Sequence, residues 1–115
     1  IERNVRFARA CMADCLKRGE APYASHLLYT QPGVLDDKIP EQRKLGIEAG
    51  FAWKDVAEAT VVYGNLGVTE GMQKGIDRAK QQPGHVIERR MLGPEWDNET
   101  VDEQITRVRE SYKGY

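Results

Sequence analysis

The fold of this chain is decided by the stretch Ala59-Thr60-Val61-Val62-Tyr63-Gly64-Asn65-Leu66-Gly67-Val68-Thr69-Glu70-Gly71-Met72. Its first part, Thr60 to Tyr63, is a run of β-branched and aromatic residues, which is typical of a strand covered on both faces. Asn65 and Gly67 enter turn conformations at low steric cost, and Thr69 is a good cap for a following helix. Ligands of open α/β sheets bind outside the carboxyl end of a strand, so the stretch predicts a binding site.

The rest of the chain alternates between helical and strand patterns on both sides of this stretch. Upstream, we expect a helix from 3 to 18, a short strand through about Ala24 that runs into a loop, and a helix from 41 to about 58. Downstream, we expect a helix from 69 to about 82, a strand from 85 to 92, and a helix from 100 to 112 capped by Asn98 or Thr100.

This order predicts an α/β fold with parallel strands joined by crossover helices. The expected architecture is a three-layer, flavodoxin-like or Rossmann-like parallel sheet with helices on its faces. A helix that opens such a fold is unusual, so we expect a further strand before Ile1, at the centre of the sheet.

Composition excludes several classes of protein. The 115 residues suit one domain with a single core, and the formal net charge of -1 provides no basic field for nucleic acid. No apolar run approaches the roughly 20 residues that span a bilayer, so no membrane partner is expected. Cys11 and Cys15 lie four residues apart on a predicted helix, where disulfide geometry is poor and a structural zinc site is not expected. A reducing cytoplasm is the expected compartment.

Four side chains outside the central stretch are candidates for chemistry. His26 and Ser25 lie near a predicted strand end, where they could meet a phosphate or act on a ligand, or only tie down their own loop. Glu48 lies in the second helix and points either into a pocket or to solvent. Arg89 and its neighbour in the last strand should point to opposite faces, so one of the two could meet a phosphate.

The chain resembles the nucleoside 2-deoxyribosyltransferase superfamily, in particular its short uncharacterised members in phages and actinobacteria. The resemblance covers about residues 2 to 92 and leaves 93 to 115 as a C-terminal helical extension. The segments that carry it are Glu2-Arg3-Asn4-Val5-Arg6-Phe7-Ala8-Arg9-Ala10, Ala21-Pro22-Tyr23-Ala24-Ser25-His26-Leu27-Leu28-Tyr29, Leu45-Gly46-Ile47-Glu48-Ala49-Gly50-Phe51-Ala52-Trp53 and Asn65-Leu66-Gly67-Val68-Thr69-Glu70-Gly71-Met72.

The resemblance implies a pocket for a nucleoside or nucleotide but puts the chemistry in doubt. Enzymes of the superfamily cleave an N-glycosidic bond with a glutamate nucleophile in the helix after the central strand. Counting from Gly71 and Ala79 places that nucleophile at Gly75, and a shifted register places it at Gln73. Neither residue has a carboxylate side chain. Glu48 remains as a relocated catalytic group.

Three functions stay open at this point. The first is binding of a nucleoside or nucleotide, such as an ADP-ribose-type signal, that the protein sequesters or senses without cleaving it. The second is an N-glycosidic-bond transferase or hydrolase with a relocated nucleophile, and the third is a structural oligomeric subunit. The resemblance also implies a homo-oligomer, and no cofactor or metal is expected. The predicted ligand-binding residues are Ser25, His26, Asn65, Gly67, Thr69, Gly71, Met72 and Arg89.

Overall fold

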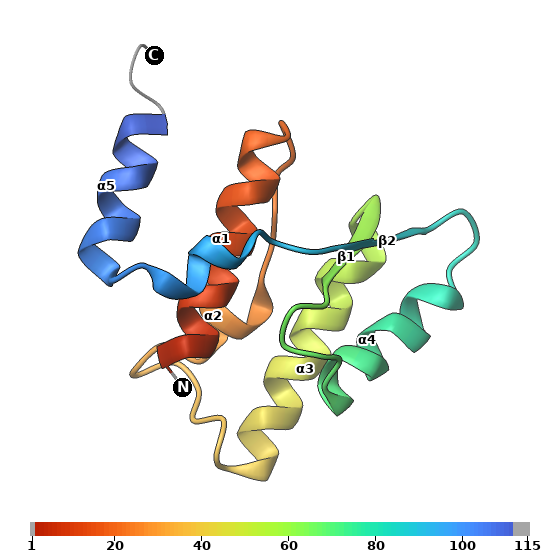
Figure 1. The fold of residues 1–115 in the computed structure, drawn as a ribbon. Coiled ribbons are helices and arrows are strands. Elements are labelled where there is room, and N and C mark those ends of the chain that lie inside the picture. The colour runs from red at the N-terminus through yellow and green to blue at the C-terminus, as the bar shows by residue number, and fades with distance from the viewer. Residues whose placement is uncertain (1, 112–115) are drawn as a thin grey trace. The chain divides into compact units, whose positions relative to one another are not determined.

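The structure is a computed structural model that describes residues 2–111, apart from the side chains of Ser25, His26 and Ser111. In chain order its elements are α1 (Glu2–Lys17), α2 (Ser25–Tyr29), α3 (Pro40–Val56), β1 (Ala59–Tyr63), α4 (Glu70–Lys80), β2 (Val86–Arg90), the 3-10 helix η1 (Pro94–Asn98) and α5 (Val101–Ser111) (Figure 1). Six of these eight elements match the predicted helices and strands to within a few residues. None of the described helices has the length and apolar character needed to cross a membrane.

The chain forms two compact units. One unit combines the residues up to Tyr23 with those from Leu92 onward, and the other runs from Ala24 to Met91. The first unit therefore contains both α1 and the predicted C-terminal helical extension.

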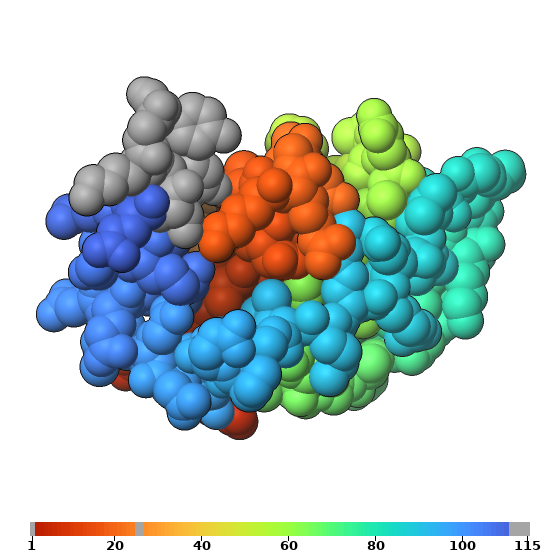
Figure 2. Space-filling model, turned by 45° about the horizontal axis from the view of Figure 1, so that its top comes forward, coloured from red at the N-terminus to blue at the C-terminus, as the bar shows by residue number. Residues whose placement is uncertain are grey.

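In the first unit, α1 packs against η1 through an aromatic pair. The rings of Phe7 and Trp96 are 4.8 Å apart and tilted by 57°, and Trp96 is buried. Arg3 lies over the Trp96 ring at 5.5 Å and also pairs with Asp97 at 2.9 Å. Figure 2 shows η1 and the residues beside it (light blue) against the start of α1 (dark red). A short 3-10 helix is thus held in place by a contact between residues far apart in the sequence.

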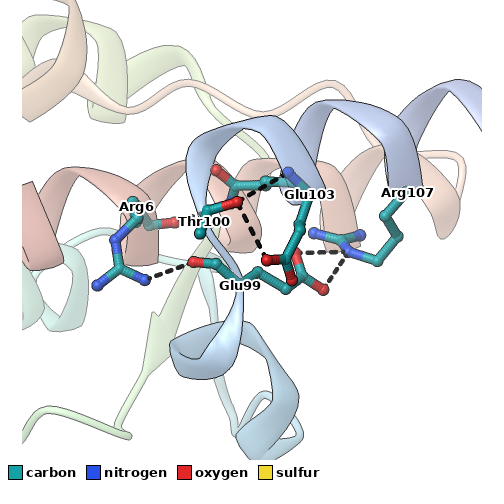
Figure 3. A network of polar contacts seen from close by, with 6 residues as sticks. Arg6, Glu99, Thr100, Glu103 and Arg107 are labelled. Carbon is teal, nitrogen blue, oxygen red and sulfur yellow. Dashed lines mark hydrogen bonds and ion pairs between the residues drawn. The ribbon is translucent and has the colours of Figure 1, made fainter.

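The start of α5 is fixed by the polar network in Figure 3. Thr100, one of the two caps predicted from the sequence, caps the helix by accepting from the Glu103 amide at 3.1 Å. The Glu99 carboxylate accepts two bonds from Arg107 Nε, at 2.8 and 3.0 Å, and Arg6 Nη1 donates to the Glu99 carbonyl at 3.1 Å. These contacts join the beginning of α5 to α1 within the unit.

The second unit contains the sheet. β1 and β2 pair in parallel with a register that sets Ala59 opposite Val86 and Tyr63 opposite Arg90. α4 packs on both strands and on α3, and it buries Gly75, Ile76 and Ala79. The predicted α/β class with parallel pairing is therefore confirmed, and the carboxyl ends of both strands lie at one edge of the sheet.

The finer architectural prediction is wrong for the residues that the structure describes. Their sheet has two strands, so it is not a three-layer Rossmann-like fold. The strand predicted through Ala24 is absent, because Ala24 instead starts a helix: its carbonyl accepts from the amides of Leu27 and Leu28 at 3.1 and 3.3 Å. A strand before Ile1 lies outside the described residues.

Candidate functional site at the carboxyl edge of the sheet

The turn after β1 is built from two glycines at the sheet edge. The Gly64 amide donates to the Arg90 carbonyl at 3.0 Å, which extends the pairing with β2 by one residue. The Gly67 amide then donates to the Gly64 carbonyl at 3.0 Å and closes a tight turn. Gly67 has a φ of +83°, a conformation that side-chain-bearing residues rarely adopt. The turn therefore brings the chain from the strand to the helix within a few residues.

Thr69 caps α4 and leaves two amides at the helix mouth. Its hydroxyl accepts from the Met72 amide at 3.2 Å, and its own amide lies 3.5 Å from Met72 Sδ. The Gln73 amide bonds the Thr69 carbonyl at 2.9 Å. Among the described residues, the amides of Glu70 and Gly71 have no acceptor, as is general for the first residues of a helix. The first turn of α4 therefore presents N–H groups and a partial positive charge.

Tyr63 and Arg90 end the two strands side by side. Arg90 Nη1 donates to the Tyr63 hydroxyl at 3.3 Å, and its guanidinium lies 5.9 Å from the ring centroid. Arg90 also pairs with the Glu88 carboxylate, and only 9% of its surface is exposed. Arg89 is the predicted ligand residue of this strand. Arg89 is exposed, and Arg90 is the arginine buried at the carboxyl edge.

A lysine ammonium occupies the space beside Gly75. A Cβ added at Gly75 would lie 2.9 Å from Lys54 Nζ, so the tip of this α3 side chain rests on the α4 backbone. Lys54 is half-buried, and burial lowers its pKa. No acidic side chain in the described part of the chain pairs with it. No local sequence signal points to Lys54, because only the packing of α3 on α4 brings it to Gly75.

The predicted residues of the central stretch lie together, whereas Glu48 lies on α3. Asn65, Gly67, Thr69, Gly71 and Met72 form the turn and the first turn of α4. Glu48 is exposed on α3 and pairs with Lys44 at 3.9 Å. Ser25 and His26 are the first two residues of α2, and their side chains are not among those that the structure describes.

A second polar cluster lies at the opposite edge, where the strands begin. Asp55 accepts from Arg78 at 2.8 Å and from Gln82 at 2.9 Å, which ties the end of α3 to the end of α4. The Thr60 hydroxyl and His85 Nε2 are 2.7 Å apart. Each of these five side chains bonds to another member of the cluster, and the buried Gln82 Oε1 has no hydrogen-bond partner among the described residues.

The carboxyl edge presents backbone amides of the kind that bind anions at helix N-termini. It combines the first amides of α4 with the turn from Gly64 to Thr69, and positions 73 and 75 of α4 carry glutamine and glycine. Gln73 donates to Asp77 at 2.8 Å on the exposed side of the helix. The residues that the structure describes contain no group of three side chains suited to hold a metal ion.

The fold and this edge define a small α/β domain with a glycine-bearing strand, turn and helix. The family model described as Domain of unknown function (DUF7768) matches residues 1–89, and the chain belongs to this family. Comparison with curated proteins and with solved structures found no match.

Proposed function

We propose that this protein binds an anionic nucleoside derivative or nucleotide, such as an ADP-ribose-type molecule, at the carboxyl edge of β1 and β2, and sequesters or senses it. The observation that carries the proposal is the turn from Gly64 to Thr69, which ends in a capped helix with free amides at the edge where parallel sheets bind ligands. The predicted contacts to the ligand come from Asn65, Gly67, Gly71 and Met72. Ser25, His26 and Arg89 remain predicted ligand residues.

The proposal is for binding without cleavage. In the superfamily that the chain resembles, the carboxylate nucleophile would stand at position 75 or 73. These positions carry glycine and glutamine here, and the space beside Gly75 holds the Lys54 ammonium. A relocated nucleophile at Glu48 has less support, because Glu48 is exposed and pairs with Lys44. Lys54 adds a positive charge next to α4, which favours an anionic ligand.

The proposal involves no cofactor, metal ion, nucleic acid or membrane. It assigns the protein to the cytoplasm, where the thiols of Cys11 and Cys15 would stay reduced. Their position on one helix does not favour a disulfide between them.

Binding is tested with a matched pair of variants at Gly71. A Cβ at this position would lie 4.0 Å from its nearest neighbour, Thr69 Oγ1, so a side chain fits. Gly71→Glu and Gly71→Gln have nearly the same size but differ by one charge. Calorimetric titration with ADP-ribose, deoxynucleotides and NAD should give binding to the wild type and to Gly71→Gln. Affinity of Gly71→Glu should fall about tenfold, because a carboxylate at the helix mouth repels an anion.

The same reaction mixtures separate binding from catalysis. Chromatography should detect no free base after long incubation of the protein with each compound. Release of base that Glu48→Gln abolishes would contradict the proposal and support a transferase or hydrolase. Equal affinities of the two Gly71 variants, or no binding of any compound by the wild type, would also overturn it.

A further inference from the structure

Lys54 carries a charge for which the described part of the chain supplies no partner. Its side chain extends from α3 to α4, and the two helices lie side by side in the second unit (Figure 1). Neither a hydrogen bond nor an ion pair joins the half-buried ammonium to any residue that the structure describes. Arg78, a cation that α4 directs toward α3, is by contrast paired with Asp55 at 2.8 Å. Charges taken out of water are normally paired, so Lys54 lacks a counter-ion.

The ammonium lies where Gly75 leaves a gap in the surface of α4. A Cβ added at Gly75 would lie 2.9 Å from Nζ and 3.6 Å from Cε of Lys54. Because glycine has no Cβ, the tip of Lys54 can approach the helix backbone this closely. Desolvation at this place disfavours the charged form and lowers the pKa of Lys54. An anion bound beside the ammonium would offset this cost.

A strip of α4 without side chains connects Lys54 with the mouth of the helix. Gly71 precedes Gly75 by four residues, so the two glycines differ by only about 40° around the helix axis. The nearest neighbour of a Cβ added at Gly71 would be Thr69 Oγ1 at 4.0 Å, so the space beside Gly71 is open. The amides of Glu70 and Gly71 lie at one end of this glycine strip, and the Lys54 ammonium lies at the other.

An anion that accepts from the helix mouth is too far from Lys54 to pair with it as well. Gly75 lies about 6 Å farther along the helix axis than Gly71, and the anion lies beyond the first amides on the opposite side. A hydrogen bond to nitrogen spans only about 3 Å. The charge that meets Lys54 therefore belongs to a second anionic group of the same ligand. In a diphosphate, a single oxygen joins two such groups, and the second can extend along the glycine strip.

We propose that Lys54 binds one phosphate of a nucleoside diphosphate whose other phosphate accepts from the amides of Glu70 and Gly71. This inference rests on the proposed function and narrows its ligand to nucleoside derivatives that contain a diphosphate. All the groups involved belong to the second unit, and no bond to the ligand forms or breaks.

Calorimetric titration with AMP and ADP tests this division of the site. The wild type should bind ADP about tenfold more tightly than AMP, because only ADP reaches both the amides and Lys54. Lys54→Gln should lose most of this difference while its affinity for AMP stays nearly unchanged. Lys54→Met, which keeps the apolar part of the side chain, should behave in the same way. The matched control is Lys44→Gln, at an exposed lysine of the same helix, which should retain the difference.

Trace acetylation with acetic anhydride gives a second measurement on the wild type itself. ADP should slow the acetylation of Lys54 severalfold, whereas AMP should not, because only ADP places a phosphate against this amine. Lys44 is the internal control and should react at the same rate with either nucleotide. Mass spectrometry of peptides measures both rates.

The outcomes separate this inference from the proposed function. Binding of AMP and ADP with equal affinity would overturn the inference and leave the proposed function in place. A folded Lys54→Gln variant that still prefers ADP about tenfold, or acetylation of Lys54 that bound ADP does not slow, would have the same meaning. Inorganic pyrophosphate should bind more weakly than ADP, and equal affinity would contradict a nucleoside diphosphate as the ligand. A wild type that binds none of these compounds would overturn both proposals.

Discussion

Gly67 and Gly75 are two glycines of the site that have different physical reasons for lacking a side chain. At Gly67 the reason is conformation, since φ is +83° and an added Cβ would meet nothing within 4 Å. At Gly75 the reason is a neighbour, since an added Cβ would lie 2.9 Å from Lys54 Nζ. The two positions should therefore respond differently to the same substitution.

Gly67→Ala should destabilise the protein by about 1 kcal/mol, because the left-handed conformation costs roughly 1–2 kcal/mol for a residue with a Cβ. Gly67→Asn should cost less, because asparagine tolerates this conformation better than alanine does. Urea unfolding of both variants and the wild type measures the difference. An alanine variant as stable as the wild type would show that the turn adopts another conformation.

Gly75→Ala should change stability little, or increase it by up to about 1 kcal/mol. Alanine is favoured over glycine inside a helix by about that amount, and the close contact is with the flexible end of Lys54, which can move. The double variant Lys54→Ala/Gly75→Ala removes the contact altogether and serves as the control. A loss of more than about 1 kcal/mol in Gly75→Ala that Lys54→Ala does not relieve would mean that another group fills this space.

The residues that sequence reasoning missed depend on contacts between elements. It identified the turn and cap from Asn65 to Met72, because glycine and threonine act locally there. It could not separate Arg89 from Arg90, since alternation puts them on opposite faces without saying which face is covered. It could not find Lys54 beside Gly75, because no local pattern relates α3 to α4.

At the scale of elements, the ends of α3 and α4 are joined by Asp55, Arg78 and Gln82. Asp55 accepts from Arg78 Nη2 at 2.8 Å and from Gln82 Nε2 at 2.9 Å. The hydrogen bond from Arg78 lowers the pKa of Asp55, and the positive charge of Arg78 adds to the effect. This contact holds the helix that carries the site against its neighbour.

The contribution of this contact should depend on pH in a defined direction. The pKa of Asp55 is lower in the folded than in the unfolded protein. The ionised carboxylate therefore stabilises the folded protein fully at pH values above the pKa of an ordinary aspartate. This contribution is lost as the pH falls through the lower pKa of the folded state. The melting temperature of Asp55→Asn should therefore lie below that of the wild type at pH 7 and approach it near pH 2. Asp37→Asn, at an exposed position, is the control. A difference that stays constant with pH would contradict the role of the carboxylate charge.

Long periodic elements were predictable, and short ones were not. The patterns for α1, α3, α4 and α5 extend over several turns with recognisable ends, and the prediction for β1 differs from the structure by one residue. The apolar run around Ala24 was too short to distinguish a strand from the helix α2. η1 depends on the packing of Trp96 on Phe7, and no local sequence pattern predicts this contact.

At the scale of the whole molecule, the chain is divided into two units, and its membership of the DUF7768 family rests on residues 1–89. That match includes all of the sheet except Arg90, and all of the turn and α4. The two-stranded sheet differs from the larger sheet that the alternation of elements predicted, because the residues around Ala24 form no strand. The carboxyl edge nevertheless contains the strand, turn and helix mouth on which the proposed function depends.

The most direct test of the proposed function is to locate the ligand by nuclear magnetic resonance. The amide signals of the isotopically labelled full chain are followed as ADP-ribose is added. We expect the largest shifts, and saturable ones, at the amides from Gly64 to Met72, above all at Glu70 and Gly71. Shifts centred instead on Asp55, Arg78 and His85 at the opposite edge, or no shifts at all, would contradict it.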